Sequence, residues 1–187
     1  MFKSILVALD GSAASNAGLK AAVQLASDER AKLVGVHVID DGAINVTFEG
    51  GYVPAAYVDK LHASLRDNGK AILAKAAAAA RAAGVDMKTV LVQSRGRTIA
   101  DAILGQVRKE KADSIVIGTH GRRGLARMLM GSDAEAVVRE SRVPVVLVRT
   151  HERAKRNPGT ARKARATRTT TERPRAGKRA VSSATVN

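Results

Sequence analysis

Short apolar runs alternate with helical segments along the first 150 residues of this 187-residue chain. The runs are continuously apolar and do not alternate with polar residues, which is typical of strands buried on both faces of a sheet. Strands that take turns with helices form parallel sheets with helices on both sides. The pattern therefore predicts one doubly wound α/β domain with a five-stranded parallel sheet.

The predicted elements follow from apolar periodicity and from turn residues. Strands are expected at 3–9, 32–39, 89–92, 114–117 and 145–148. Helices are expected at 13–28, 55–83 and 98–108, and a fourth begins at Gly131-Ser132. The long helix ends at Gly84, and its predicted buried face carries Leu61, Leu65, Ile72, Ala76 and Ala79.

Composition excludes several classes of protein. Hydrophobic residues make up 45% of the chain, which suits a globular core, although only 2% are aromatic. The absence of cysteine excludes a disulfide framework and a cysteine-based zinc site. No signal peptide and no apolar run of membrane-spanning length is present. We therefore expect a soluble cytoplasmic protein without a membrane partner.

Residues 151–187 differ in kind from residues 1–150. They hold 11 of the 32 basic residues and two of the 17 acidic ones, which is +9 of the net charge of +15. They contain no aromatic residue and no apolar periodicity, so we expect a disordered basic tail. Such a tail attracts nucleic acid or another polyanion without sequence preference. The alternative is a solubilising extension.

A spaced set of small residues follows the predicted strand 114–117. It comprises Gly118, Gly121, and then Gly131-Ser132 after nine further residues. A strand, a glycine loop and a helix N-terminus together hold phosphate, because backbone N–H groups and the helix dipole attract an anion that glycine lets approach. A single glycine after a strand usually serves a turn. Three at this spacing favour phosphate contact.

Parallel sheets bind ligands beyond the carboxyl ends of their strands, where the strand order reverses. The predicted first and fourth strands meet there, and they end in Asp10 and Gly118. Asp10 has two interpretations, as a ligand-binding residue or as a turn residue before Gly11. Arg122, Arg123 and Arg127 in the glycine loop either neutralise phosphate or form a solvated basic loop.

Ser132-Asp133-Ala134-Glu135 has the spacing of a capping box, in which the serine side chain accepts from the backbone and the glutamate reaches back. The Ser132 backbone N–H would remain available for phosphate. Residues 41–55 interrupt the strand and helix pattern and carry Phe48 and Tyr52 beside Gly50-Gly51. We favour a surface loop there over a flap across the site.

Catalytic and metal-binding residues are not indicated. No nucleophile and base can be paired, and neither His37 nor His120 has a second histidine or cysteine at ligand spacing. We therefore expect a binding protein and no enzyme, with slow ATP hydrolysis as one alternative. A nucleic-acid-associated protein that uses its basic tail on a dimeric scaffold is the other.

Over residues 2–149 the chain resembles the universal stress protein family. The segments that carry the resemblance are Ile5–Ser12, Val36–Asp40, the glycine signature and Val143–Val148. The resemblance implies a sheet of order 3-2-1-4-5, a homodimer, and a regulatory or protective role under stress. The final strand, Val145 to Val148, would pair the two subunits, because an apolar sheet edge needs a cover and two such edges give a two-fold interface.

The glycine signature matches the nucleotide-binding branch of that family, which implies ATP, with Mg²⁺, as the ligand. The binding residues implied are Ala8, Asp10, Val38, Ile117, Gly118, Gly121, Arg122, Gly131, Ser132 and Asp133. Asp10 would lie at the nucleoside end, Ala8 and Val38 at the base, and the glycines along the ribose and phosphates. Related nucleotidyl-transferring folds carry a histidine pair at positions that read Asp10 to Ala14 here, which argues against nucleotidyl transfer.

Overall fold

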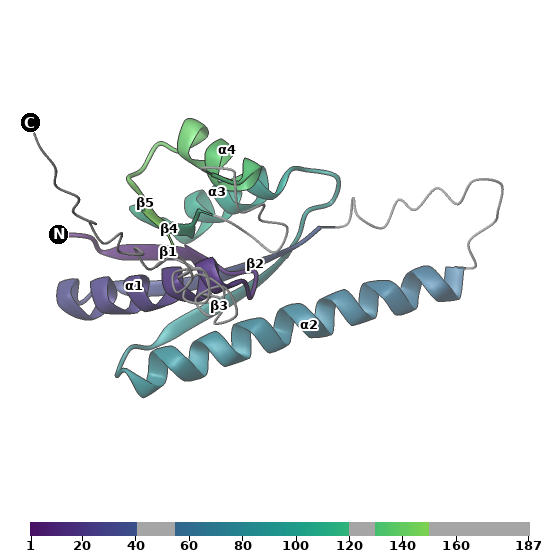
Figure 1. Ribbon diagram of the computed structural model, residues 1–187, viewed down its shortest axis with the longest axis horizontal. Coiled ribbons are helices and arrows are strands. Elements are labelled where there is room, and N and C mark those ends of the chain that lie inside the picture. Colours follow the sequence, from purple (N-terminus) through teal and green to yellow (C-terminus); the bar gives the residue numbers. More distant parts are fainter. Residues whose placement is uncertain (41–54, 120–129, 150–187) are drawn as a thin grey trace, which may run out of the picture. The chain divides into compact units, whose positions relative to one another are not determined.

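The computed structural model describes residues 1–40, 55–119 and 130–149. Strands and helices alternate along them, as the apolar pattern predicts (Figure 1). In chain order the elements are β1 (Ser4–Ala8), α1 (Ala13–Glu29), β2 (Lys32–Ile39), α2 (Ala55–Ala82), β3 (Met87–Gln93), α3 (Ile99–Glu110), β4 (Ser114–Gly118), α4 (Ser132–Glu140) and β5 (Val145–Val148).

The strands form one parallel sheet of order β3-β2-β1-β4-β5, which confirms the predicted order. β1 lies in the centre, with Ile5 opposite Leu33 of β2 on one side and Ser114 of β4 on the other. The strand order reverses between β1 and β4. The point of reversal that the sequence prediction used is therefore present, and the ligand position beyond it stays a prediction.

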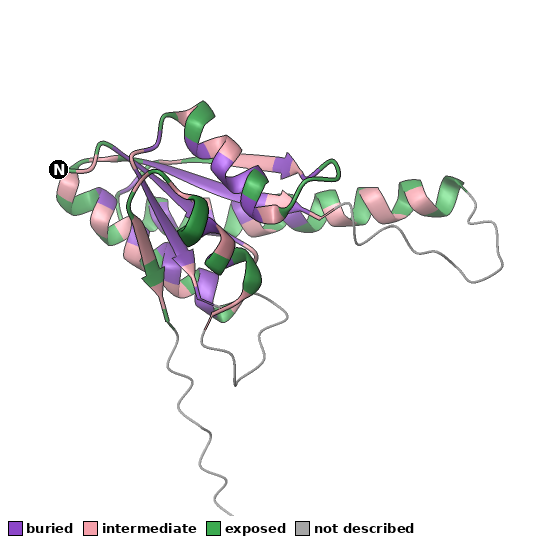
Figure 2. Cartoon of the chain, turned by 90° about the horizontal axis from the view of Figure 1, so that it is seen from above, coloured by how far each residue is buried: buried purple, intermediate pink, exposed green. Residues whose placement is uncertain are grey.

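Helices cover both faces of the sheet, and each face has its own apolar cluster. One cluster joins α1 and α2 to the sheet through Leu19, Ala22 and Leu73. The other joins α3 and α4 through Ile103 and Val137. The central strands are buried between these layers, as Figure 2 shows in purple. This burial on both faces explains why the strands are continuously apolar in sequence.

Local side chains define the ends of two helices. Ser12 caps α1 by accepting from the Ser15 N–H at 3.1 Å. Thr98 caps α3 by accepting from the Asp101 N–H at 3.0 Å. Each of these bonds satisfies a backbone donor that the first turn of a helix leaves without an intrahelical partner. The caps fix where the chain turns from a strand into a helix.

The predicted boundaries need small corrections. β3 runs from Met87 to Gln93 and contains the predicted strand residues 89–92. β4 includes Gly118. In α2 the buried residues are Gly69, Leu73, Ala76 and Ala80. Ala79, predicted to be buried, is exposed because the helix turns it away from the sheet.

Candidate functional site

The turn from β1 to α1 is organised by hydrogen bonds around Asp10 and Ser15. Asp10 Oδ1 accepts from the Ser12 N–H at 2.9 Å, and Gly11 between them has φ +82°. Ser15 Oγ accepts from the Asp10 and Gly11 N–H groups at 3.3 and 3.1 Å. The turn role weighed for Asp10 is therefore present. The network also fixes the position of its carboxylate at the carboxyl end of β1.

Gly118 ends β4 where the strand lies close against α1. A Cβ atom added to Gly118 would lie 2.7 Å from the carbonyl carbon of Ala14 and 2.8 Å from its oxygen. Gly18 lies one turn further along α1. A Cβ atom added to Gly18 would lie 3.6 Å from the backbone nitrogen of Gly118. Gly118 therefore has a packing function, whatever it contributes to a ligand.

The two ends of the glycine loop are tied together. The Gly131 N–H donates to the Thr119 carbonyl at 2.8 Å, and the Thr119 N–H donates to the Val148 carbonyl at 2.9 Å. Thr119 is almost fully buried. These bonds bring Gly131 and Gly118 together at the carboxyl edge of the sheet. They join the start of α4 to the ends of β4 and β5.

The predicted capping box at α4 is wrong. The N-cap is Gly131, which has no side chain to donate or accept, and Ser132 is already the first residue of the helix. The Glu135 N–H donates to the Gly131 carbonyl at 3.0 Å. The N-cap residue therefore contributes no side-chain cap to α4. That turn also carries Asp133 and Glu135, which lower the positive potential at the helix N-terminus.

Three of the predicted binding residues, including the two expected at the base, share one face of the sheet. Ala8, Val38 and Ile117 all belong to the apolar cluster under α3 and α4 or pack against it. Ile117 is buried, whereas Ala8 and Val38 are half-buried near the ends of their strands. Gly121 and Arg122 lie outside the described residues, as do Arg123 and Arg127. The predicted loop 41–55 falls outside them as well, except for Ala55, which begins α2.

Sequence reasoning missed Ser15 and Thr119 as organising residues. Ser15 is 4% exposed and joins the Asp10 turn to α1. Its position three residues after Ser12 is the only signal that could have identified it. His37 is buried and its Nδ1 donates to the Leu9 carbonyl at 2.6 Å, which gives it a structural function. Among the described residues no group of three potential metal ligands comes together.

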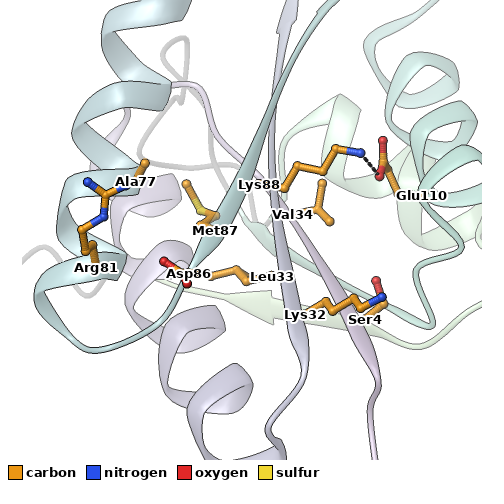
Figure 3. A pocket seen from close by; sticks show the side chains of 10 residues that line it. All are labelled: Ser4, Lys32, Leu33, Val34, Ala77, Arg81, Asp86, Met87, Lys88 and Glu110. Atoms are coloured by element: carbon orange, nitrogen blue, oxygen red, sulfur yellow. Dashed lines mark hydrogen bonds and ion pairs between the residues drawn. The ribbon is translucent and has the colours of Figure 1, made fainter.

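A cleft of about 540 Å³ lies at the opposite edge of the sheet, at the amino ends of β1, β2 and β3. Ser4, Lys32 and Met87, which begin these strands, are among its lining residues. Figure 3 shows Lys88 reaching Glu110, with which it forms an ion pair at 2.7 Å. None of the predicted nucleotide-binding residues lines this cleft.

No helix in the described part of the chain is long and apolar enough to span a membrane.

Comparison with known proteins agrees with this architecture. Residues 1–149 match the universal stress protein family. The universal stress protein YxiE of Bacillus subtilis is 33% identical over 151 residues, which are 80% of this chain and 100% of that protein. The universal stress protein MJ0531 of Methanocaldococcus jannaschii is 30% identical over 150 residues, which are 80% of this chain and 83% of that protein.

Solved structures of that family share the fold. A family member from Burkholderia pseudomallei is 34% identical with a TM-score of 0.61, and the match covers 78% of this chain and 95% of that one. A universal stress protein solved in complex with cAMP is 28% identical with a TM-score of 0.57, and the match covers 79% and 97%. The matched family, the curated relatives and the sheet order agree, and the chain belongs to the universal stress protein family.

Proposed function

We propose that this chain binds ATP beyond the carboxyl ends of β1 and β4 and acts as a nucleotide-responsive regulator or protective factor under stress. The observation that carries the proposal is the geometry of Gly131. This signature glycine is the N-cap of α4, and its N–H donates to the carbonyl of Thr119, which directly follows Gly118. A related universal stress protein was solved with cAMP, an adenine nucleotide, which supports the ligand class.

Backbone conformation does not explain the glycine at position 131. Its φ of −75° and ψ of 153° are open to any residue, and serine, aspartate or asparagine would cap α4 better. A side chain is therefore missing at a helix N-terminus where one would stabilise the fold. Close approach of an anion to the backbone accounts for this choice.

The residues present fit a phosphate chain that carries Mg²⁺. Asp133 and Glu135 in the first turn of α4 disfavour a bare polyphosphate, and a bound cation offsets them. Mg²⁺ prefers one or two carboxylates together with phosphate oxygens and water. Asp133 would supply such a carboxylate and Ser132 a backbone N–H, and the sequence adds Arg122 to the loop. Mg²⁺ would supply charge neutralisation of the phosphates.

We further propose a binding function without efficient catalysis. In the β1–α1 turn, the side chains of Asp10, Ser12 and Ser15 all bond to nearby backbone groups of the same turn. Residues engaged in this way support the fold and do not form a nucleophile with its base. Slow ATP hydrolysis is the alternative, and turnover of labelled ATP by the purified chain tests it.

Thermal unfolding with Mg-ATP tests the binding proposal. A ligand that binds only the folded state at about 100 times its Kd stabilises it by about 2.7 kcal/mol. We expect a corresponding rise in Tm for the natural sequence. Gly131→Thr should abolish the rise, because its side chain enters the phosphate path. Threonine and glycine are similar N-cap residues, so the stability without ligand should change little.

The control variant is Gly105→Ala on α3, where an added Cβ has no neighbour closer than 3.8 Å. This variant should keep the full response to Mg-ATP. If nucleotide-free protein of natural sequence shows no change of Tm in millimolar Mg-ATP, the proposed ligand is wrong. An equal response in the Gly131→Thr protein would show that the ligand binds elsewhere.

A further inference from the structure

The outer edge of β3 combines open strand geometry with a concentration of cationic side chains. Among the described strands, β3 pairs only with β2, so the opposite edge of its seven residues carries outward backbone N–H and C=O groups. Edge strands without a bulge or proline are templates for a further strand. β3 has no proline, and its register with β2 is continuous from Met87 to Gln93.

A cleft of about 530 Å³ runs along the carboxyl half of this edge. Four cationic side chains line it, and none of the described residues that line it is acidic: the cations are Arg66, Arg95, Arg97 and Lys109. The amino half of β3 differs, because there Lys88 pairs with Glu110. The positive charge is therefore concentrated beside residues 90–93.

The cations flank the strand from both faces of the sheet. Arg66 belongs to α2, which packs with Leu91 on one face. Lys109 belongs to α3, which packs with Val90 and Val92 on the other. Side chains of a strand point alternately to the two faces. An added strand with acidic residues on both faces would therefore meet a cation on each side.

Two of the cations are held by the turn that follows β3. The buried Ser94 accepts from the Arg97 N–H at 3.1 Å and from Arg97 Nε at 3.2 Å. Arg95 and Gly96 between them have φ values of +50° and +75°. A left-handed backbone conformation is unfavourable for arginine but not for glycine, because glycine has no Cβ atom. The turn nevertheless presents Arg95 at the end of the cleft.

We propose that the outer edge of β3 is a docking surface for an extended acidic segment of a partner protein, which adds to the sheet as a sixth strand. Backbone hydrogen bonds would give affinity, and carboxylates on both faces would give specificity. Like charge excludes the chain's own basic residues 151–187 as the occupant. It also disfavours the β3 edge of a second copy, which carries the same four cations.

Fluorescence anisotropy with the labelled peptide Thr-Glu-Glu-Thr-Glu-Glu-Thr tests the proposal on the full chain. Its glutamates occupy both faces when it is extended. We expect the double variant Arg66→Glu and Lys109→Glu to weaken binding about tenfold, as loss of exposed ion pairs predicts. The charge-matched control, Lys20→Glu with Lys75→Glu on exposed positions of α1 and α2, should bind like the natural sequence.

A peptide methylated on every backbone nitrogen keeps the charge but loses the donors, and it should not bind. Equal binding of the methylated peptide, or equal losses in the two double variants, would overturn the proposal in favour of general attraction to a basic chain. Binding of inorganic tripolyphosphate that depends on Arg66 and Lys109, without peptide binding, would also overturn it. Loss of self-association in the Arg66→Glu, Lys109→Glu protein would likewise overturn the proposal of an acidic partner segment.

Discussion

Gly118 and Ala14 are in backbone contact, because an added Cβ on Gly118 would lie 2.7 Å from the carbonyl carbon of Ala14. The last residue of β4 thus lies directly against the first turn of α1. Moving either backbone would disrupt regular structure, since Ala14 lies in the α1 helix and Gly118 pairs with Val148 of β5. The first glycine of the signature is required by packing alone.

Gly118→Ala should therefore destabilise the protein with or without nucleotide. We expect a loss of about 1–3 kcal/mol in the free energy of unfolding, the usual cost of overpacking. Urea denaturation in nucleotide-free buffer measures it. Gly105→Ala in the middle of α3 is the matched control and should gain up to about 1 kcal/mol from helix propensity. An unchanged midpoint for Gly118→Ala would contradict the contact.

Ser15→Ala should loosen the turn that holds Asp10. The change leaves the Asp10 and Gly11 N–H groups without the acceptor that they share. Both donors are only partly buried, so the loss should cost about 0.5–1.5 kcal/mol, which chemical denaturation would show as a lower midpoint. Ser27→Ala, an exposed position later in α1, should change stability by less than about 0.5 kcal/mol. Similar losses in both variants would remove Ser15 from the turn network.

The predicted homodimer through β5 can be tested at Leu147. Its side chain is 39% exposed at the free edge of the sheet, whereas Val146 packs into the cluster under α1. Leu147→Glu should keep the fold and weaken self-association at least about tenfold, since two buried like charges would face each other. Sedimentation velocity at micromolar concentration measures the change. A monomer of the natural sequence would refute the dimer.

Val146→Lys is a poor substitute for that variant. It places a charge in the apolar cluster and should lower the free energy of unfolding as well as affect assembly. Comparing the two variants by circular dichroism separates loss of the interface from loss of the fold.

Deleting residues 151–187 should remove non-specific binding of nucleic acid while leaving the response to Mg-ATP intact. The expectation rests on the 11 basic residues of this segment. If about six phosphates of duplex DNA are neutralised, the slope of log affinity against log salt is about −5. Gel-shift titrations across salt concentrations measure it. Equal retardation of the full and shortened chains would assign the binding to residues 1–150.

The sheet was predictable because burial leaves a direct mark on sequence. The continuously apolar run around Leu6 and Val7 requires helices on both faces, and the structure has them. Strand and helix ends were harder, because they depend on polar contacts between distant residues. The Leu9 N–H, for example, donates to the Val36 carbonyl although β1 ends at Ala8.

The sequence predicted where the signature glycines lie in the fold, but only part of the local structure around them. Glycine spacing indicated the edge of the sheet where Gly118 and Gly131 now lie together. The cap of α4 was mispredicted because Ser132 with Glu135 satisfies the capping pattern, and sequence spacing does not reveal that the helix starts one residue earlier. The packing function of Gly118 depends on Ala14, more than 100 residues away, and leaves no local signal.

α2 divides into two halves with different support. From Gly69 onward it buries a residue on the sheet at nearly every turn, but residues 55–68 include none that is buried. This first half is about 21 Å long, and an isolated helix of that length is only marginally stable in water. Its amide protons should therefore exchange with solvent through local opening. Those of residues 69–82 should exchange only when the helix leaves the sheet.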